Sequence, residues 1–234
     1  MIRTQALGKT FGRTVALADV DLQVARGECL ALVGTNGGGR TTLLRILATL
    51  LRPSAGTLEI DGLDAIRQPH RVRSRLVYVG EETPRPEGLR VGEYLAFVAG
   101  ARGPRATPGA ARRVAEVLDR AKLQADIPVD ALSSGVRQQL ALAAALLVAP
   151  AVMLLDNPFR SLDPAARALF TNWLREHRDR GTTMVVAVND EAAATSLGHA
   201  VARLDRGRIV SRSAARNVSA GRLHNSPELS GVEA

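Results

Sequence analysis

A chain of 234 residues with a hydrophobic fraction of 46% is long and apolar enough for one large domain with its own core. Its single cysteine, Cys29, excludes an intramolecular disulfide and fits a reducing compartment. The net charge of +8 comes mostly from scattered arginines, without a basic tract interleaved with aromatic residues, so we expect no nucleic-acid partner.

The first predicted elements are two strands, at Ile2–Leu7 and Val15–Val24, joined by a turn around Phe11-Gly12-Arg13. Phe11 lies just before the turn glycine, and the residue alone supports two interpretations equally. It is either an aromatic ring that stacks on an adenine base or an anchor in the core of a small sheet.

The glycine-rich segment that follows predicts a phosphate-binding loop. It reads Gly34-Thr35-Asn36-Gly37-Gly38-Gly39-Arg40-Thr41-Thr42, between an apolar strand-like run at 29–33 and a run with helical spacing at 43–47. Backbone N–H groups of such a loop, together with the start of its helix, bind phosphate oxygens. Gly34, Gly39 and Thr41 match the pattern G-x-x-x-x-G-K-[ST]. Arg40 replaces its lysine, and a planar guanidinium is not equivalent to a compact ammonium. The alternative is a glycine-rich turn that binds nothing.

The middle of the chain predicts two more strands and three helices. The strands are expected at Thr57–Ile60 and Leu76–Val79, and the helices at Val91–Ala101, at Thr107–Leu123 and from Leu132-Ser133-Ser134-Gly135 to Val148. The longest apolar run, Leu140–Ala149, is far shorter than the ~20 residues of a membrane span. No signal-like segment opens the chain, so we expect a soluble cytoplasmic protein.

A buried strand that ends in a carboxylate is the main feature of the second half. Val152–Asp156 is an apolar run, and the carboxyl ends of such strands face the ligand in open α/β folds. An aspartate at this place suits the coordination of Mg²⁺ beside a nucleotide. Beyond it we expect a helix at Pro164–Asp179, a strand at Thr183–Val188, a hairpin from Ala200–Leu204 and Arg208–Val210, and a polar, disordered tail over 211–234.

These motifs, in this order, resemble an ABC-type ATPase domain: the glycine-rich loop, the Leu-Ser-x-Gly segment, the strand ending at Asp156, and Ser161-Leu162-Asp163. The resemblance covers residues 1–210. It implies an α/β fold of the P-loop NTPase class, with a mixed sheet core, a small antiparallel β subdomain and a helical subdomain at roughly 81–148. The runs Tyr78–Glu81 and Val91–Phe97 are similar to nucleotide-binding subunits of exporters for drugs, sodium or haem.

The resemblance implies ATP and Mg²⁺ as ligands and assigns roles to several residues. Phe11 stacks on adenine, the loop holds the phosphates, and the metal is held by Thr41, Glu81 and Asp156. The signature residues Ser133, Ser134 and Gly135 contact nucleotide held by the opposite subunit, although Ser133 as a simple helix cap remains the alternative. The implied partners are a transmembrane transporter subunit and a second ABC domain, in a homodimer or heterodimer on the inner face of the cell membrane.

The chain departs from the family pattern at catalytic positions. Arg40 replaces the loop lysine, Asn157 the glutamate that polarises the attacking water, and Asn189 the histidine that contacts the γ-phosphate. Glu81 replaces the glutamine of the family pattern, and a glutamate is often found at this position in the export subgroup. An amide cannot accept a proton, and general-base help is worth about 10²–10⁴ in rate. We therefore expect an ATPase by family with impaired hydrolysis.

Three classes of function follow from this pattern. The first is the ATP-binding subunit of a transporter, with weak or no hydrolysis at its own site. The second is a pseudo-ATPase that serves as a structural or regulatory subunit. The third, a soluble ABC protein of translation or DNA repair, is disfavoured because the chain has neither a tandem second domain nor a long coiled-coil insertion.

Overall fold

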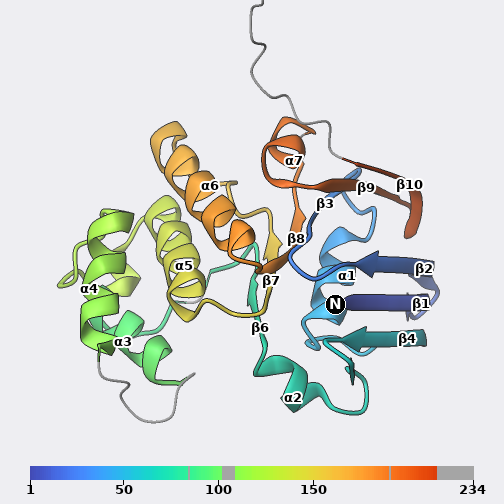
Figure 1. Cartoon of the computed structure of the whole chain (residues 1–234), viewed down its shortest axis with the longest axis horizontal. Coiled ribbons are helices and arrows are strands. Elements are labelled where there is room, and N and C mark those ends of the chain that lie inside the picture. Colours follow the sequence, from blue (N-terminus) through green and yellow to red (C-terminus); the bar gives the residue numbers. More distant parts are fainter. Residues whose placement is uncertain (84, 102–108, 190, 215–234) are drawn as a thin grey trace, which may run out of the picture.

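The structure consists of two β-sheets and a group of helices (Figure 1). The computed structural model describes residues 1–83, 85–101, 109–189 and 191–214. The smaller sheet is antiparallel, with the order β2-β1-β4-β5. Its strands are β1 (Ile2–Phe11), β2 (Thr14–Val24), β4 (Ala55–Ile60) and β5 (Leu63–Asp64). Buried and exposed side chains alternate along the second half of β2, so one face of this sheet packs on the core.

The larger sheet has six strands in the order β10-β9-β3-β8-β7-β6. Its strands are β3 (Cys29–Val33), β6 (Leu76–Val79), β7 (Val152–Asp156), β8 (Thr183–Ala187), β9 (Ala200–Asp205) and β10 (Arg208–Ala214). All pair in parallel except the edge strand β10. Every residue of β3, β7 and β8 is buried, which explains why these three strands are continuous apolar runs.

Helices cover both faces of the six-stranded sheet. They are α1 (Arg40–Leu47), α2 (Pro69–Arg73), α3 (Val91–Ala101), α4 (Ala110–Ala121), the 3-10 turn η1 (Val129–Ala131), α5 (Ser134–Val148), α6 (Pro164–Asp179) and α7 (Glu191–Leu197). Alternate residues of β3 face two different cores. Cys29 and Ala31 pack with α3, α5 and α6, whereas Leu30 and Leu32 pack with α1 and the antiparallel sheet. The large sheet is therefore the middle layer.

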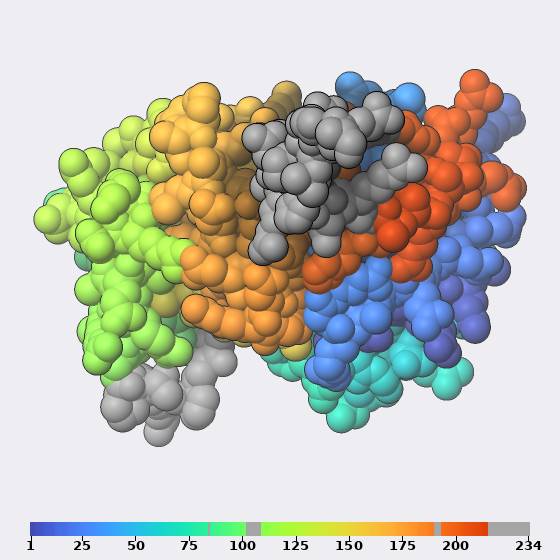
Figure 2. Space-filling view, turned by 45° about the horizontal axis from the view of Figure 1, so that its top comes forward, coloured from blue at the N-terminus to red at the C-terminus, as the bar shows by residue number. Residues whose placement is uncertain are grey.

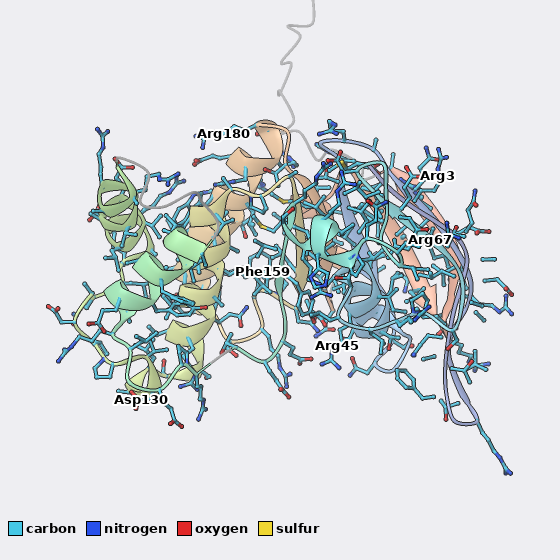
Figure 3. All side chains as sticks on the ribbon, turned by 90° about the horizontal axis from the view of Figure 1, so that it is seen from below. Arg3, Arg45, Arg67, Asp130, Phe159 and Arg180 are labelled. Atoms are coloured by element: carbon cyan, nitrogen blue, oxygen red, sulfur yellow. The ribbon has the colours of Figure 1, made fainter. Side chains whose placement is uncertain are left out.

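The helices α3 and α4 and the antiparallel sheet lie at opposite ends of the molecule, with α6 between them (Figures 1 and 2). Within the described part of the chain, no helix is long and apolar enough to cross a membrane. Of the arginines labelled in Figure 3, Arg3 and Arg67 lie by the antiparallel sheet, Arg45 lies on α1, and Arg180 lies just after α6. This spread matches the scatter of basic residues in the sequence.

The predicted fold class is confirmed: an α/β fold with a mixed sheet, a small antiparallel sheet and a group of helices. The tail prediction was wrong at its start. Residues 211–214 belong to β10, with Ser211 opposite Arg203 and Ala214 opposite Ala200. An edge strand is held by its backbone hydrogen bonds, so exposed polar side chains did not reveal it. The rest of the tail, 215–234, lies outside the described residues.

Candidate functional site

The loop between β3 and α1 needs glycine at particular positions. A Cβ on Gly34 would lie 2.0 Å from the carbonyl oxygen of Leu204, a distance that no side chain tolerates. Gly39 precedes α1 with a φ of 102°, and its Cβ would lie 2.7 Å from the carbonyl oxygen of Ala16. The glycine pattern therefore reflects close packing of the loop against β2 and β9.

A cavity of about 440 Å³ opens beside this loop. Its lining residues are Ala16, Thr35, Asn36, Gly37, Gly38, Gly39, Arg40, Thr41, Thr42, Glu81, Asn157, Arg160 and Asn189. The cavity is within the usual size range of small-ligand sites. It brings together the predicted loop with Glu81, Asn157 and Asn189, which come from three distant parts of the chain.

Arg40 is buried and does not stand free in the cavity. One of its terminal nitrogens donates to the carbonyl oxygen of Val188, and the other donates to Oδ1 of Asn189 at 2.8 Å. Burial lowers the pKa of its guanidinium, and the nearby Asp156 carboxylate opposes that shift. Two departures from the family pattern, Arg40 and Asn189, thus contact each other directly.

Asp156 lies at the carboxyl end of β7, beneath the loop and fully buried. Burial raises the pKa of this carboxyl group, while a hydrogen bond from Thr41 and the charges of Arg40 and Arg45 act in the opposite direction. Its Oδ2 lies 3.5 Å from the Tyr78 hydroxyl, and its Oδ1 has no hydrogen-bond partner among the residues that the structure describes. A buried acceptor oxygen without a partner, next to the Thr41 hydroxyl, fits the oxygen donors that Mg²⁺ prefers.

Glu81 and Arg160 form an ion pair at the cavity, with Nη1 of the arginine against Oε1 of the carboxylate. Sequence reasoning missed Arg160 as a site residue. It stands between Asn157 and the Ser161-Leu162-Asp163 motif, and no motif position marked it. The pair forms because β6 and β7 are neighbouring parallel strands, so the segments that follow them leave the sheet at the same edge.

Asn157 lines the cavity and also serves the turn after β7. Its φ is +47°, a conformation that asparagine tolerates better than most residues. Its backbone N–H donates to Ala187 at 2.9 Å, and its carbonyl accepts from Arg160 at 3.1 Å. The amide side chain therefore has a local conformational reason to be here in addition to its place in the cavity.

The signature residues lie outside the cavity, at the start of α5. Ser133 is the N-cap, its hydroxyl accepting from the Val136 N–H at 3.3 Å, and Ser133 and Ser134 are exposed. A Cβ on Gly135 would lie 2.6 Å from the carbonyl oxygen of Ser161, so only glycine permits this contact. The start of α5 is thus held against the loop that follows β7 and remains open to a partner.

Phe11 also lies outside the lining of the cavity. Its side chain is 49% exposed, with the Lys9 ammonium 5.0 Å from the ring centre. The interpretation of Phe11 as a core anchor is therefore wrong. Stacking of this ring on adenine stays a prediction.

The fold and the site define a nucleotide-binding domain of the ABC type. The chain belongs to the ABC transporter family, whose model matches residues 17–160. It is similar to the sulfate/thiosulfate import ATP-binding protein CysA of Bradyrhizobium diazoefficiens, with 38% identity over 89% of this chain and 62% of the relative. It is 36% identical to the daunorubicin resistance ATP-binding protein DrrA3 of Streptomyces coeruleorubidus, over 91% of this chain and 67% of the relative.

Solved structures agree with this assignment. A structure of the ATP-binding subunit of an ABC transporter matches with a TM-score of 0.85 and 25% identity, covering 92% of this chain and 90% of that chain. The ATP-binding cassette MJ0796, solved as a dimer in a post-hydrolysis state bound to ADP and Pi, matches with a TM-score of 0.85 and 25% identity, covering 92% of this chain and 99% of that chain. The chain spans less than two thirds of the length of the CysA relative.

Proposed function

We propose that this chain is the ATP-binding subunit of a membrane transporter, with weak or no hydrolysis at its own nucleotide site. The position of Arg40 supports this most directly, because its terminal nitrogens donate to Val188 and Asn189. An amide at Asn157 cannot accept a proton from water. The site thus keeps a backbone that binds phosphates but lacks the groups that activate the attacking water.

Magnesium fits this site, and Thr41, Asp156 and Glu81 are the residues that would hold it. When bound, the ion neutralises negative charge on the phosphates. The protein's own contribution is the loop backbone and the start of α1, which orient the phosphates. We also propose that residues 1–210 form the ATP-binding domain and that residues 81–148 are roughly its helical subdomain.

The contrast between the two kinds of motif favours a mixed dimer. Arg40, Asn157 and Asn189 depart from the family pattern, whereas Ser133 and Gly135 match it and lie at an exposed helix start. The relative solved as a dimer shows that such cassettes associate in pairs. We propose a partner domain with intact catalytic residues, which uses the signature of this chain; a homodimer is the alternative.

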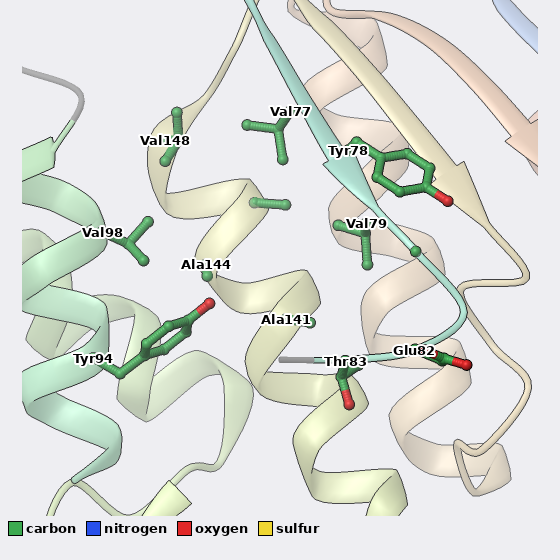
Figure 4. Close-up of a pocket in the computed structure, with 12 residues that line it drawn as sticks. Val77, Tyr78, Val79, Glu82, Thr83, Tyr94, Val98, Ala141, Ala144 and Val148 are labelled. Carbon is green, nitrogen blue, oxygen red and sulfur yellow. The ribbon is translucent and has the colours of Figure 1, made fainter. Parts of the chain in front are cut away.

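A second hollow, of about 330 Å³, is the place we propose for the transmembrane subunit (Figure 4). Tyr94 and Val98 of α3 face Val77 of β6 across Ala144 of α5 there. Its lining continues through Glu82 and Thr83, directly after Glu81 of the phosphate cavity. A segment of the transmembrane subunit docked here would contact this chain next to its nucleotide site. The ATP-binding subunit would then lie on the cytoplasmic face of the membrane.

The isolated chain is expected to bind ATP weakly and to hydrolyse it negligibly. The loop backbone, Thr41 and Asp156 remain for binding, while Arg40 is held elsewhere and Asn157 cannot act as a base. Calorimetry and phosphate release on one preparation measure both quantities. Turnover near one per second, which is ordinary for phosphoryl-transfer enzymes, would contradict the proposal.

Ala141→Arg is expected to remove binding to the transmembrane subunit without affecting ATP binding. Ala141 of α5 lines the second hollow, and an arginine side chain at this position would fill it. Ala96→Arg, on the exposed side of α3, is the matched control. Co-purification from the native host with tagged variants gives the readout. Equal retention of membrane subunits by both variants would place the docking surface elsewhere.

The second candidate function is a pseudo-ATPase that acts as a structural or regulatory subunit. The direct contact between Arg40 and Asn189 favours it, since this contact occupies both groups within the chain. Such a subunit would not supply its signature residues to the nucleotide of a partner. Loss of complex activity after a substitution at Ser133 would exclude it.

A further inference from the structure

We propose that Arg160 is the residue that binds the terminal phosphate of ATP in this chain, and that Glu81 holds Arg160 at the cavity until nucleotide enters. The inference rests on the proposed function, because it concerns the nucleotide site. It assigns a binding role to an arginine that no motif marks.

In the described part of the chain, two cations are within reach of a phosphate in the cavity, and only one of them is uncommitted. Among the described residues that line the phosphate cavity, the cations are Arg40 and Arg160. Both terminal nitrogens of Arg40 already donate to Val188 and Asn189, and its side chain is buried. The Arg160 side chain is 64% exposed and pairs with Glu81, so it is the cation that can reorient toward a phosphate.

Arg160 can exchange its carboxylate partner Glu81 for a phosphate at a low cost in free energy. An ion pair between exposed side chains contributes little to stability, so ligand binding can break it easily. A terminal phosphate carries a charge of about −1.5 to −2 at pH 7 and offers three acceptor oxygens, whereas Glu81 carries a single negative charge. Arginine binds phosphate oxygens in a bidentate manner. The exchange from Glu81 to phosphate is therefore favourable.

Arg160 also has space around its side chain. Arg160 lines the phosphate cavity and also a neighbouring hollow of about 220 Å³ beside Asn157 and Asn189. Its backbone is fixed, because its N–H donates to the carbonyl of Asn157 at 3.1 Å. A fixed backbone with room on two sides lets the guanidinium leave Glu81 without rearrangement of the turn.

Calorimetric titration of the full chain with ATP and with ADP, in EDTA and in Mg²⁺, tests the proposal. Arg160→Ala is expected to weaken ATP binding about tenfold or more, since a charged hydrogen bond to the γ-phosphate is lost. ADP lacks this phosphate, so its binding is expected to weaken less than about threefold. Arg160→Lys is expected to retain most of the affinity. Arg112→Ala is the matched control, because Arg112 forms an exposed ion pair with Glu116 on α4 and does not line the cavity.

A double-substitution experiment tests the role of Glu81. In EDTA, Glu81→Gln is expected to tighten ATP binding about threefold, and this gain is expected to vanish in the Arg160→Ala background. ATP affinity within about twofold of wild type in Arg160→Ala, or equal loss for ATP and ADP, would overturn the inference alone. A wild-type chain that binds no ATP would overturn both the inference and the proposed function. Circular dichroism and thermal unfolding verify that each variant is folded.

Discussion

Ser133→Arg is expected to abolish ATP hydrolysis by the complex of this chain with its proposed partner domain. Ser133 is exposed at the start of α5, where a hydroxyl and backbone N–H groups are good phosphate ligands. Arginine removes the hydroxyl and keeps the partner's nucleotide away from the helix. Loss of one preorganised donor to a transition state costs about 10²–10³ in rate. Phosphate release from the reconstituted complex measures the effect.

Asn157→Ala in the same complex is the control, and it is expected to change activity little because the site of this chain contributes little turnover. Ser133→Ala distinguishes the role of Ser133 as an N-cap of α5 from its proposed contact with the partner's nucleotide. Loss of an N-cap lowers the stability by about 1 kcal/mol, which thermal unfolding detects. Equal loss of activity from Ser133→Arg and Asn157→Ala would contradict the mixed dimer. So would a stable homodimer with no partner in native pull-downs.

The triple substitution Arg40→Lys, Asn157→Glu and Asn189→His is expected to raise hydrolysis by the isolated chain about 100-fold or more. Lysine lacks the two guanidinium nitrogens that bind Val188 and Asn189, and it places a compact charge at the phosphates. Glutamate supplies the missing base, which alone is worth about 10²–10⁴. Phosphate release at saturating ATP is the measurement.

Arg40→Lys alone is the matched comparison for the triple variant. It is expected to strengthen ATP binding while turnover stays negligible, because Asn157 still leaves the water unactivated. Robust hydrolysis by Arg40→Lys would show that Asn157 does not occupy the water-activating position. A triple variant that binds ATP tightly yet remains inactive would show that these three residues do not limit the reaction.

Local sequence patterns were enough for most elements of this fold. The strand Val152–Asp156 and the helix Pro164–Asp179 have the predicted bounds, because a run of apolar residues and an Asp163-Pro164 cap are local signals. The helices α2 and α7 were missed, since each is too short to show an apolar period. The strand β10 was found only in part, because backbone pairing at a sheet edge leaves little trace in side chains.

The sequence by itself determined the family, the glycine loop and the identity of the departures at Arg40, Asn157 and Asn189. Only the tertiary structure decided what those departures do. Arg40 and Asn189 are 149 positions apart, and they meet because parallel strands β3 and β8 end at one edge of the sheet. Glu81 and Arg160 meet for the same reason after β6 and β7. Composition and spacing carry no information on such pairs, since the strand order of the folded sheet sets which loop ends are neighbours.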